Sequence, residues 1–415
     1  MAMKLKRLHY GWVMVILSIF VQAVHIMMIY AFGVFLIPVT MEFNWERGAL
    51  SAALSITMLV GGSLSIFTGR LCDKYGPRPL VTVGGLAAGT AYLLMAQISS
   101  LWQAYLIWGL LLGIAWSCLT IPVTSTIPRW FHKRRGIAQG LTMTGIGLGG
   151  VIWPPLAQWL ISSYSWQQAY IIVGLATIII LIPLAQFMKH SPQRMGLKPY
   201  GEDEPADEQS PASVMGGISL QQVIKTGRFW IFGFITFAFL FCIQPIVVHI
   251  TPHAVDIGIS AMVAAIIPSI IAAVSLIGRV GIGSISDKVG PRPALTACVV
   301  LFTLAMVWLL FAKEAWMLYV FAVISGIAYG GETAVMTLVP AELFGLKYLG
   351  AIAAATMFFG TVGAAIGTPS GGAIFDVTGS YQLAFLIWLI LGGLAIILCL
   401  ILLRFESYRD MVVAE

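Results

Sequence analysis

The sequence predicts an all-α membrane protein with twelve transmembrane helices in two pseudo-symmetric six-helix bundles. The 415 residues are 59% hydrophobic and only 10% charged, with a mean hydropathy of +0.93, whereas soluble domains carry roughly 25% charged residues. Apolar runs of about twenty residues, long enough to span a bilayer, recur from end to end. The alternating ten-residue segments of a membrane β-barrel are missing from the sequence.

The hydrophobic runs and the breaks between them give the expected spans in order. They are residues 12–39, 49–69, 79–97, 102–127, 136–161, 168–188, 229–250, 261–285, 293–312, 316–340, 349–373 and 381–404. Residues 189–228 form the long polar interruption, which is acidic and proline-bearing and lacks apolar periodicity. We therefore expect an N-terminal bundle over 1–188, a flexible cytoplasmic linker over 189–228 and a C-terminal bundle over 229–415.

The positive charges indicate the orientation. All Lys and Arg residues except Arg47, Arg279 and Lys313 lie at the two termini, in the linker or in the even-to-odd loops. By the positive-inside rule, both termini and the linker are cytoplasmic in a multi-pass protein of the cell membrane. The same distribution argues against a nucleic-acid partner despite the net charge of +6. The first apolar run is too long for a signal-peptide core and has no small-residue cleavage site, so we expect the mature protein to keep it.

Cofactor chemistry has no candidate in the sequence. The five cysteines show no paired spacing and lie mostly in apolar runs, which argues against structural disulfides and a zinc site. Neither a nucleophile–base pair nor a phosphate-binding loop is found, so an enzyme is not expected. We expect a monomer that works in the lipid bilayer without a cofactor or metal.

Arg279 is the exceptional charge, since it lies inside an apolar run. It precedes Asp287, in the following loop, by eight residues or about 12 Å of helix, and half a hydrocarbon core is about 15 Å. Arg279 is therefore expected near the bilayer midplane, where an ionised group costs at least ~2.5 kcal/mol and normally faces a cavity. A cation there favours an anion-binding site, or a permanent ion pair with Glu332.

An eleven-residue motif occurs twice, as GRLCDKYGPRP from Gly69 and as GSISDKVGPRP from Gly283. Seven of the eleven positions are identical, and the copies are 214 residues apart, each after the second span of its half. Four shared charges are candidate gating residues: Asp73, Arg78, Asp287 and Arg292. The carboxylates can bond helix N-termini or basic side chains and lock the cytoplasmic side, or the charges can simply anchor the topology.

Together with twelve spans, this motif resembles the signature of the major facilitator superfamily. The segment RWFHKRRGIAQG from Arg129 to Gly140 resembles a signature of its monocarboxylate porter family, which includes lactate and pyruvate transporters and the oxalate–formate exchanger. His9-Tyr10-Gly11-Trp12 resembles the shorter prokaryotic form of that family's first signature. The resemblance implies transport between two parallel repeats that alternate in access to a central site.

The resemblance also implies site residues. Family members bind the substrate carboxylate with an arginine that matches Arg279, and a guanidinium suits a carboxylate. Tyr329 matches a cavity-lining aromatic residue, and Trp116 and Cys118 match lining positions, although each can instead pack in the core. Ser275 stands where eukaryotic members have an aspartate.

Two further departures concern cations. Thr356 stands where the oxalate exchanger has a second cation, and no lysine occurs between Lys6 and Lys74, where eukaryotic members have one in the first helix. One intramembrane cation favours a monocarboxylate over a dicarboxylate.

The proton route of those relatives therefore cannot be transferred. The remaining candidates are Glu332, His25, His249 and Asp256. Glu332 shares a helical face with Tyr329, His25 extends a polar stripe with Ser18 and Gln22, and His249 is placed to guard the outer entrance and contact substrate.

The sequence thus predicts a proton-coupled carrier of small monocarboxylates such as lactate, pyruvate or short-chain acids. The alternatives are an organic-anion exchanger of the oxalate–formate type, an efflux carrier for a larger anion, and a non-transporting membrane receptor.

Overall fold

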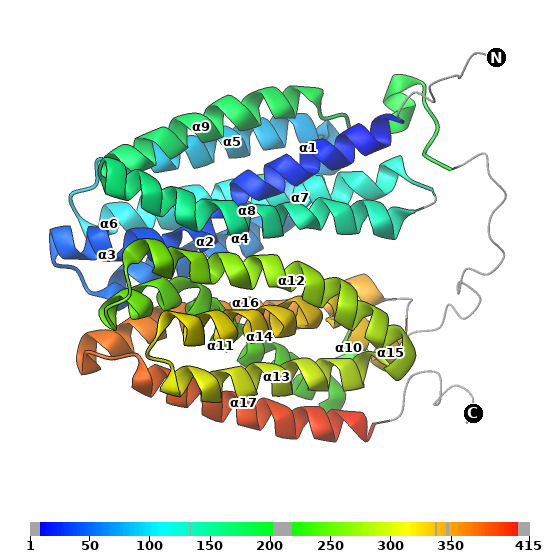
Figure 1. Cartoon of the computed structure of the whole chain (residues 1–415). Coiled ribbons are helices and arrows are strands. Elements are labelled where there is room, and N and C mark those ends of the chain that lie inside the picture. Colours follow the sequence, from blue (N-terminus) through cyan, green and yellow to red (C-terminus); the bar gives the residue numbers. More distant parts are fainter. Residues whose placement is uncertain (1–8, 133, 202–217, 337, 346–347, 406–415) are drawn as a thin grey trace, which may run out of the picture. The chain divides into compact units, whose positions relative to one another are not determined.

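The computed structural model describes residues 9–132, 134–201, 218–336, 338–345 and 348–405. Nearly all of these residues are helical (Figure 1), and within them extended pairing is limited to a parallel β-bridge between Phe131 and Tyr200. The predicted all-α class is confirmed.

The helices of the first half follow the expected spans closely. They are α1 (Tyr10–His25), α2 (Met27–Tyr30), α3 (Phe32–Phe43), α4 (Arg47–Tyr75), α5 (Pro77–Met95), α6 (Leu101–Ala104), the π-helical η1 (Tyr105–Leu111), α7 (Leu112–Thr126), the 3₁₀ turn η2 (Ile127–Trp130), α8 (Arg135–Ser163) and α9 (Trp166–Phe187). The first span is interrupted at Ile26 and Ala31, so α1, α2 and α3 share it.

The second half repeats the pattern. It contains α11 (Gly227–Asp256), α12 (Ala261–Val289), α13 (Pro291–Phe311), α14 (Ala315–Val335), α15 (Leu338–Phe344), α16 (Leu349–Thr378) and α17 (Gln382–Leu403). Between the halves, η3 (Pro192–Met195) and α10 (Leu220–Val223) flank the linker residues 202–217, which lie outside the described residues.

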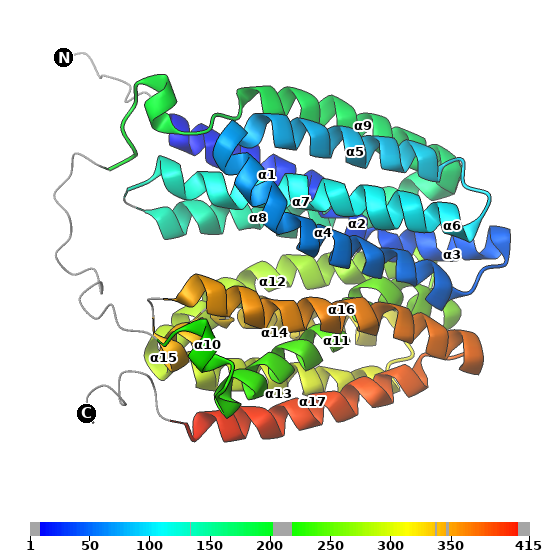
Figure 2. The ribbon, with the colours of Figure 1, turned by 180° about the vertical axis from the view of Figure 1, so that it is seen from behind.

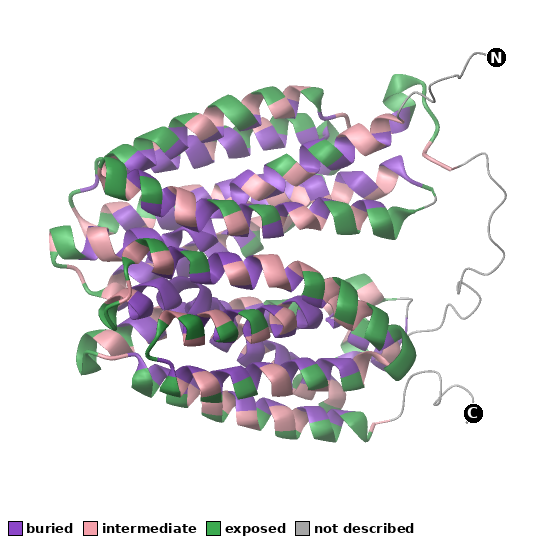
Figure 3. Ribbon diagram, in the orientation of Figure 1, coloured by how far each residue is buried: buried purple, intermediate pink, exposed green. Residues whose placement is uncertain are grey.

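In the described part of the chain, ten helical stretches are long and apolar enough to cross a membrane. The two other expected spans form α5 and α8. Every expected span therefore falls on a helix. Exposed positions recur along α17 (Figure 3). Its exposed apolar residues follow one another at intervals of three or four, as expected of a helix that faces lipid: Leu383, Leu386, Ile390, Leu394 and Ile397.

Contacts divide the chain into two compact units. Unit 1 comprises Met1–Met28, Ile56–Gly150 and Leu160–Glu208, and unit 2 comprises Ile29–Ser55, Val151–Trp159 and Gln209–Glu415. In unit 1, α5 and α9 lie side by side (Figures 1 and 2). In unit 2, α12 packs on α14 and α11 packs on α16. Because α3 and the start of α4 belong to unit 2, the predicted division into bundles 1–188 and 229–415 stays a prediction.

Candidate functional site

Arg279 lies on α12 where that helix touches α14. A Cβ atom on Gly330 would lie 1.9 Å from the Ser275 carbonyl oxygen, and one on Gly278 would lie 2.4 Å from the Ile327 carbonyl oxygen. Only glycine therefore fits at these two crossing points, and the two backbones are in direct contact. This close packing places Arg279 beside the polar face of α14.

Among the described residues, the Arg279 guanidinium has no hydrogen-bond or ion-pair partner. Its side chain is partly buried, Nε is fully buried without a hydrogen bond, and no ion pair joins it to any described carboxylate. Its charge interacts electrostatically with Glu332, Tyr329 and Tyr30. Buried polar groups are normally hydrogen-bonded. The arrangement therefore offers a cation with free donors to an anionic ligand.

Tyr30 is a site residue that the sequence reasoning missed. It ends α2, is only 3% exposed, and lies near enough to Arg279 for the guanidinium charge to act on its hydroxyl group. The periodicity of an unbroken helix continues the stripe of Ser18, Gln22 and His25 to residue 29. The helix is interrupted at Ile26, so the residues after it no longer continue the same helical face. A spacing of 3.6 residues per turn therefore could not predict that Tyr30 lies at the site.

Glu332 is buried on α14, 2% exposed, on the same face as Tyr329. It is near enough to Arg279 for an electrostatic interaction, but the two do not form an ion pair. Its carboxylate makes no hydrogen bond with a described residue. The permanent Arg279–Glu332 pair considered from sequence is therefore not formed in this structure, and the carboxylate remains available for a proton.

Ser275 and Thr356 direct their hydroxyl groups to their own helices. Ser275 Oγ donates to the Ala272 carbonyl at 2.8 Å, and Thr356 Oγ1 lies 3.1 Å from the Ile352 carbonyl and 3.0 Å from the Ala353 carbonyl. Both side chains are buried. Their hydroxyl protons are thus already engaged, so a substrate contact at either residue stays a prediction that this geometry does not favour.

His25 and Trp116 meet within unit 1. Their rings are 5.3 Å apart in an edge-to-face arrangement, and His25 Nε2 lies 3.3 Å from Thr120 Oγ1. His25 Nδ1 is buried without a partner, as are the polar side-chain atoms of Gln22 and Ser18. The predicted stripe on α1 therefore carries unused hydrogen-bonding capacity, as a cavity-facing surface requires.

Cys118 has a different environment from Trp116. It clusters with Cys72 and Leu80, and its Cβ lies close to Gly84 of α5. This placement favours packing in the interior of unit 1 over contact with a substrate.

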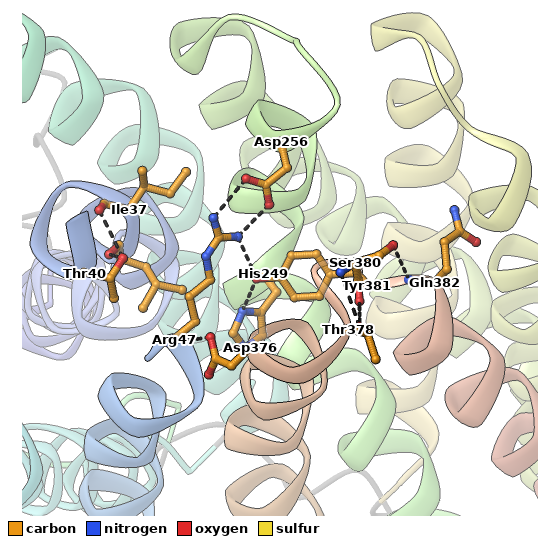
Figure 4. A network of polar contacts seen from close by, with 11 residues as sticks. Ile37, Thr40, Arg47, His249, Asp256, Asp376, Thr378, Ser380, Tyr381 and Gln382 are labelled. Atoms are coloured by element: carbon orange, nitrogen blue, oxygen red, sulfur yellow. Dashed lines mark hydrogen bonds and ion pairs between the residues drawn. The ribbon is translucent and has the colours of Figure 1, made fainter. Parts of the chain in front are cut away.

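Two further candidates, His249 and Asp256, belong to a polar network around Arg47 (Figure 4). The Arg47 guanidinium bonds both Asp256 carboxylate oxygens, at 2.6 and 2.9 Å, and donates to the Tyr381 hydroxyl at 3.2 Å. It also lies 3.9 Å from the centre of the Phe375 ring. We call Arg47, His249, Asp256, Phe375, Asp376 and Tyr381 the Arg47 cluster.

Asp376 anchors the beginning of α4 within this cluster. Its carboxylate accepts hydrogen bonds from the backbone N–H groups of Arg47 at 2.9 Å and Gly48 at 2.7 Å. A Cβ atom on Gly48 would lie 2.5 Å from the Ala373 nitrogen, so glycine permits this approach. A carboxylate at a helix N-terminus is stabilising because the first N–H groups have no partners inside the helix.

His249 uses both ring nitrogens. Nε2 lies 2.8 Å from the Thr368 carbonyl oxygen, which can only accept, so Nε2 carries a proton. Nδ1 lies 3.1 Å from the Tyr381 hydroxyl and accepts from it in the neutral ring. With His249 so engaged and Asp256 paired to Arg47, the substrate and proton roles predicted for these residues stay predictions without geometric support.

The two loop motifs are bonded differently. Asp73 pairs with Arg129, and Arg78 Nε donates to Gln186 Oε1 at 2.7 Å, all within unit 1. Asp287 is exposed and pairs with no described residue, whereas Arg292 pairs with Glu342 at 2.7 Å. The basic partner predicted for such an aspartate is thus found for Asp73 alone among the described residues, and the gating roles stay predictions.

The two signature segments pack against each other. The ring of Trp12 lies 5.0 Å from that of Phe131, and the ring of Tyr10 lies 5.4 Å from that of Trp130. Trp130 and Phe131 are fully buried, and Tyr200 completes the aromatic cluster through its β-bridge with Phe131. These segments therefore hold the start of α1 to the end of η2.

Comparison with known proteins identifies relatives that are membrane transporters. The sequence matches the family described as the Major Facilitator Superfamily over residues 18–300 and 280–413. It is 29% identical over 391 residues to monocarboxylate transporter 13 of Rattus norvegicus, covering 91% of this chain and 85% of that protein. It is 28% identical over 372 residues to monocarboxylate transporter 11 of Homo sapiens, covering 84% and 74%.

Among solved structures, the chain resembles a bacterial homologue of the human lysosomal transporter Spinster. The inward-facing, occupied form superposes with a TM-score of 0.74 at 15% identity, covering 95% of this chain and 97% of that one. The unoccupied form gives a TM-score of 0.70. At this identity the likeness concerns the fold alone.

Proposed function

Because the chain belongs to the major facilitator superfamily, and is thus a multi-pass membrane transporter and not an enzyme, we propose that it carries small monocarboxylates. Lactate, pyruvate and short-chain acids are the expected substrates. The names of its relatives, monocarboxylate transporters 11 and 13, agree with this class.

The unpaired guanidinium of Arg279 is the observation that carries the proposal. Its buried Nε lacks a hydrogen-bond partner, and a carboxylate supplies the two acceptor oxygens that the planar fork matches. Tyr329 and Tyr30 interact with the same charge, and their hydroxyl groups can donate to the bound carboxylate or to an α-hydroxyl group. A single intramembrane cation selects one carboxylate over two.

Proton coupling makes the cycle electroneutral. An uncompensated charge that passes an apolar gate is unfavourable, so an anion moves best with a proton. Glu332 is the carrier we favour, since it is buried beside Arg279 without being paired to it. His25, with a buried and unpartnered Nδ1, is the second candidate.

Transport proceeds by alternating access in this proposal. The bundles 1–188 and 229–415 rock about the site and expose Arg279 to one side of the cell membrane and then to the other. The termini and the linker are cytoplasmic, and a monomer suffices.

Uptake by the purified full chain in proteoliposomes tests the proposal. Labelled lactate, acetate and oxalate are offered with and without an inward proton gradient. We expect lactate and acetate to accumulate faster with the gradient, and oxalate to be excluded. Uptake driven by internal substrate and indifferent to the gradient would indicate an exchanger. Binding without flux would indicate a receptor.

Glu332→Gln separates the proton route from substrate binding. The variant should exchange internal for external lactate at close to the wild-type rate but lose acceleration by the gradient, because glutamine cannot carry a proton. His25→Gln is the matched control. If the gradient still accelerates Glu332→Gln but not His25→Gln, the carrier is His25.

A further inference from the structure

A basic pocket lies in unit 1, and its lining includes none of the residues assigned to substrate. Its volume is about 320 Å³. It is lined by the junction of α4 and α5 and by the segment that follows α9, with the residues Tyr75, Gly76, Pro77, Arg78, Pro79, Met188, Lys189, His190, Arg194 and Met195. Three of these side chains are permanent cations, and none is a carboxylate.

The three cations of this basic pocket are not neutralised by the described protein. Arg78 donates through Nε to the neutral amide of Gln186, and neither Lys189 nor Arg194 pairs with a described carboxylate. The nearby carboxylate of Asp73 is already paired with Arg129. Like charges gathered around one cavity repel each other, so an anion in the cavity is favourable.

His190 adds a hydrogen-bond donor without a partner. Its Nε2 lies 3.0 Å from an Arg129 nitrogen that can only donate, so Nε2 accepts and Nδ1 carries the proton. Nδ1 is buried beside Gly76 and has no hydrogen bond. Burial and the neighbouring guanidinium groups of Arg129 and Arg194 lower the pKa of His190, which keeps the ring in this neutral form.

In the second copy of the loop motif, the arginine has a carboxylate partner that the arginine of the first copy lacks. There, Arg292 Nε donates to Glu342 Oε1 at 2.8 Å, and NH1 donates to the carbonyl oxygen of Phe405. The arginine of the second copy is therefore neutralised by a carboxylate of the protein. At the equivalent Arg78, the bonded partner is an uncharged amide.

We propose that the basic pocket binds a phosphate group, either in the headgroup of an anionic phospholipid or as soluble phosphate. Guanidinium and ammonium groups are the side chains that bind phosphate oxygens, and basic residues at the ends of spanning helices attract anionic lipid. Exposed apolar residues border the pocket, since Met195, 40% exposed, lines it and Phe187, 59% exposed, precedes it. These residues favour the lipid, whose chains can lie along α9.

Lipid retention by the full chain tests this proposal. The detergent-purified protein is offered phosphatidylglycerol or phosphatidylcholine, and retained lipid is counted by native mass spectrometry. The double variant Lys189→Gln/Arg194→Gln should bind phosphatidylglycerol about 25-fold more weakly, at about fivefold for each charge. The matched control Arg70→Gln removes an exposed cation of α4 outside the pocket and should bind as wild type.

A charge-conserving double variant controls for misfolding in this test. Lys189→Arg/Arg194→Lys keeps both charges and should retain the lipid, which distinguishes lost binding from misfolding. Equal retention by wild type and the double glutamine variant overturns the proposal, as does equal retention of phosphatidylcholine. Displacement of the lipid by millimolar inorganic phosphate supports the phosphate site with a soluble source. Lactate uptake is measured separately, so the two proposals fail independently.

The acidic run Glu202, Asp203 and Glu204 follows the pocket residues closely in sequence and provides a last control. When all three are changed to glutamine, unchanged lipid affinity supports a phosphate ligand. An increase of tenfold or more would show that the chain's own carboxylates occupy the pocket, and would overturn the proposal.

Discussion

Arg47 and Arg279 both lie in unit 2, but their surroundings are opposite. Arg47 bonds both oxygens of Asp256, contacts Tyr381 and Phe375, and begins a helix that Asp376 anchors. Arg279 has a buried Nε without a hydrogen bond and no ion pair to any described residue. Removing one partner of a bonded, largely buried charge destabilises the fold, whereas a charge without a partner is available to a ligand.

The largest expected effect is on transport when Arg279 is changed. Arg279→Gln should reduce lactate uptake at least about 100-fold, because a bidentate charge-assisted contact to the carboxylate is lost. Arg279→Lys keeps the charge but not the planar fork and should lose less. Initial uptake at equal protein density measures both, and thermal unfolding checks the fold. Near-normal uptake by Arg279→Gln would remove Arg279 from the site.

Substitutions in the Arg47 cluster should lower the stability of the fold and leave the affinity for lactate unchanged. Arg47→Gln and Asp256→Asn should each lower the free energy of unfolding by about 2 kcal/mol, because the remaining charge loses its partner. The side chains are 14% and 27% exposed, so water compensates part of the loss. The double variant should be little worse than either single one, which gives a coupling energy of about 1–2 kcal/mol. Additive losses would contradict a specific pair.

The smallest effects separate two tyrosines. Tyr30→Phe should weaken lactate binding about fivefold with little change in stability, because it removes the hydroxyl group that we propose donates to the substrate. Tyr381→Phe should lower stability by about 1 kcal/mol and leave affinity unchanged, because its hydroxyl group contacts Arg47 and His249. Substrate-binding titrations and thermal unfolding of both variants measure this difference. If Tyr30→Phe instead lowered stability and Tyr381→Phe weakened binding, the substrate site would lie at the Arg47 cluster and not at Arg279.

The family signatures show how sequence resemblance and local chemistry differ. His9-Tyr10-Gly11-Trp12 and Trp130-Phe131 identified a family related to monocarboxylate transporters, yet the structure uses them to pack α1 against η2. Through the family they indicate a class of substrate, but their aromatic side chains pack against each other.

The sequence by itself determined the spans, the repeated loop motif, the superfamily and the exceptional position of Arg279. The spans and the position of Arg279 depend on composition within about thirty residues, and the motif and the superfamily can be recognised by comparing sequences, without any contact in space. The tertiary structure decided which polar groups are already satisfied. Arg47 bonds Asp256 and Tyr381, which are 209 and 334 residues away. Tyr30, which follows the helix break at Ile26, lies near enough to Arg279 to feel its charge. Such partners are brought together by packing in space. The sequence could therefore identify the charged residues, but not which of them are already bonded to another residue of the protein.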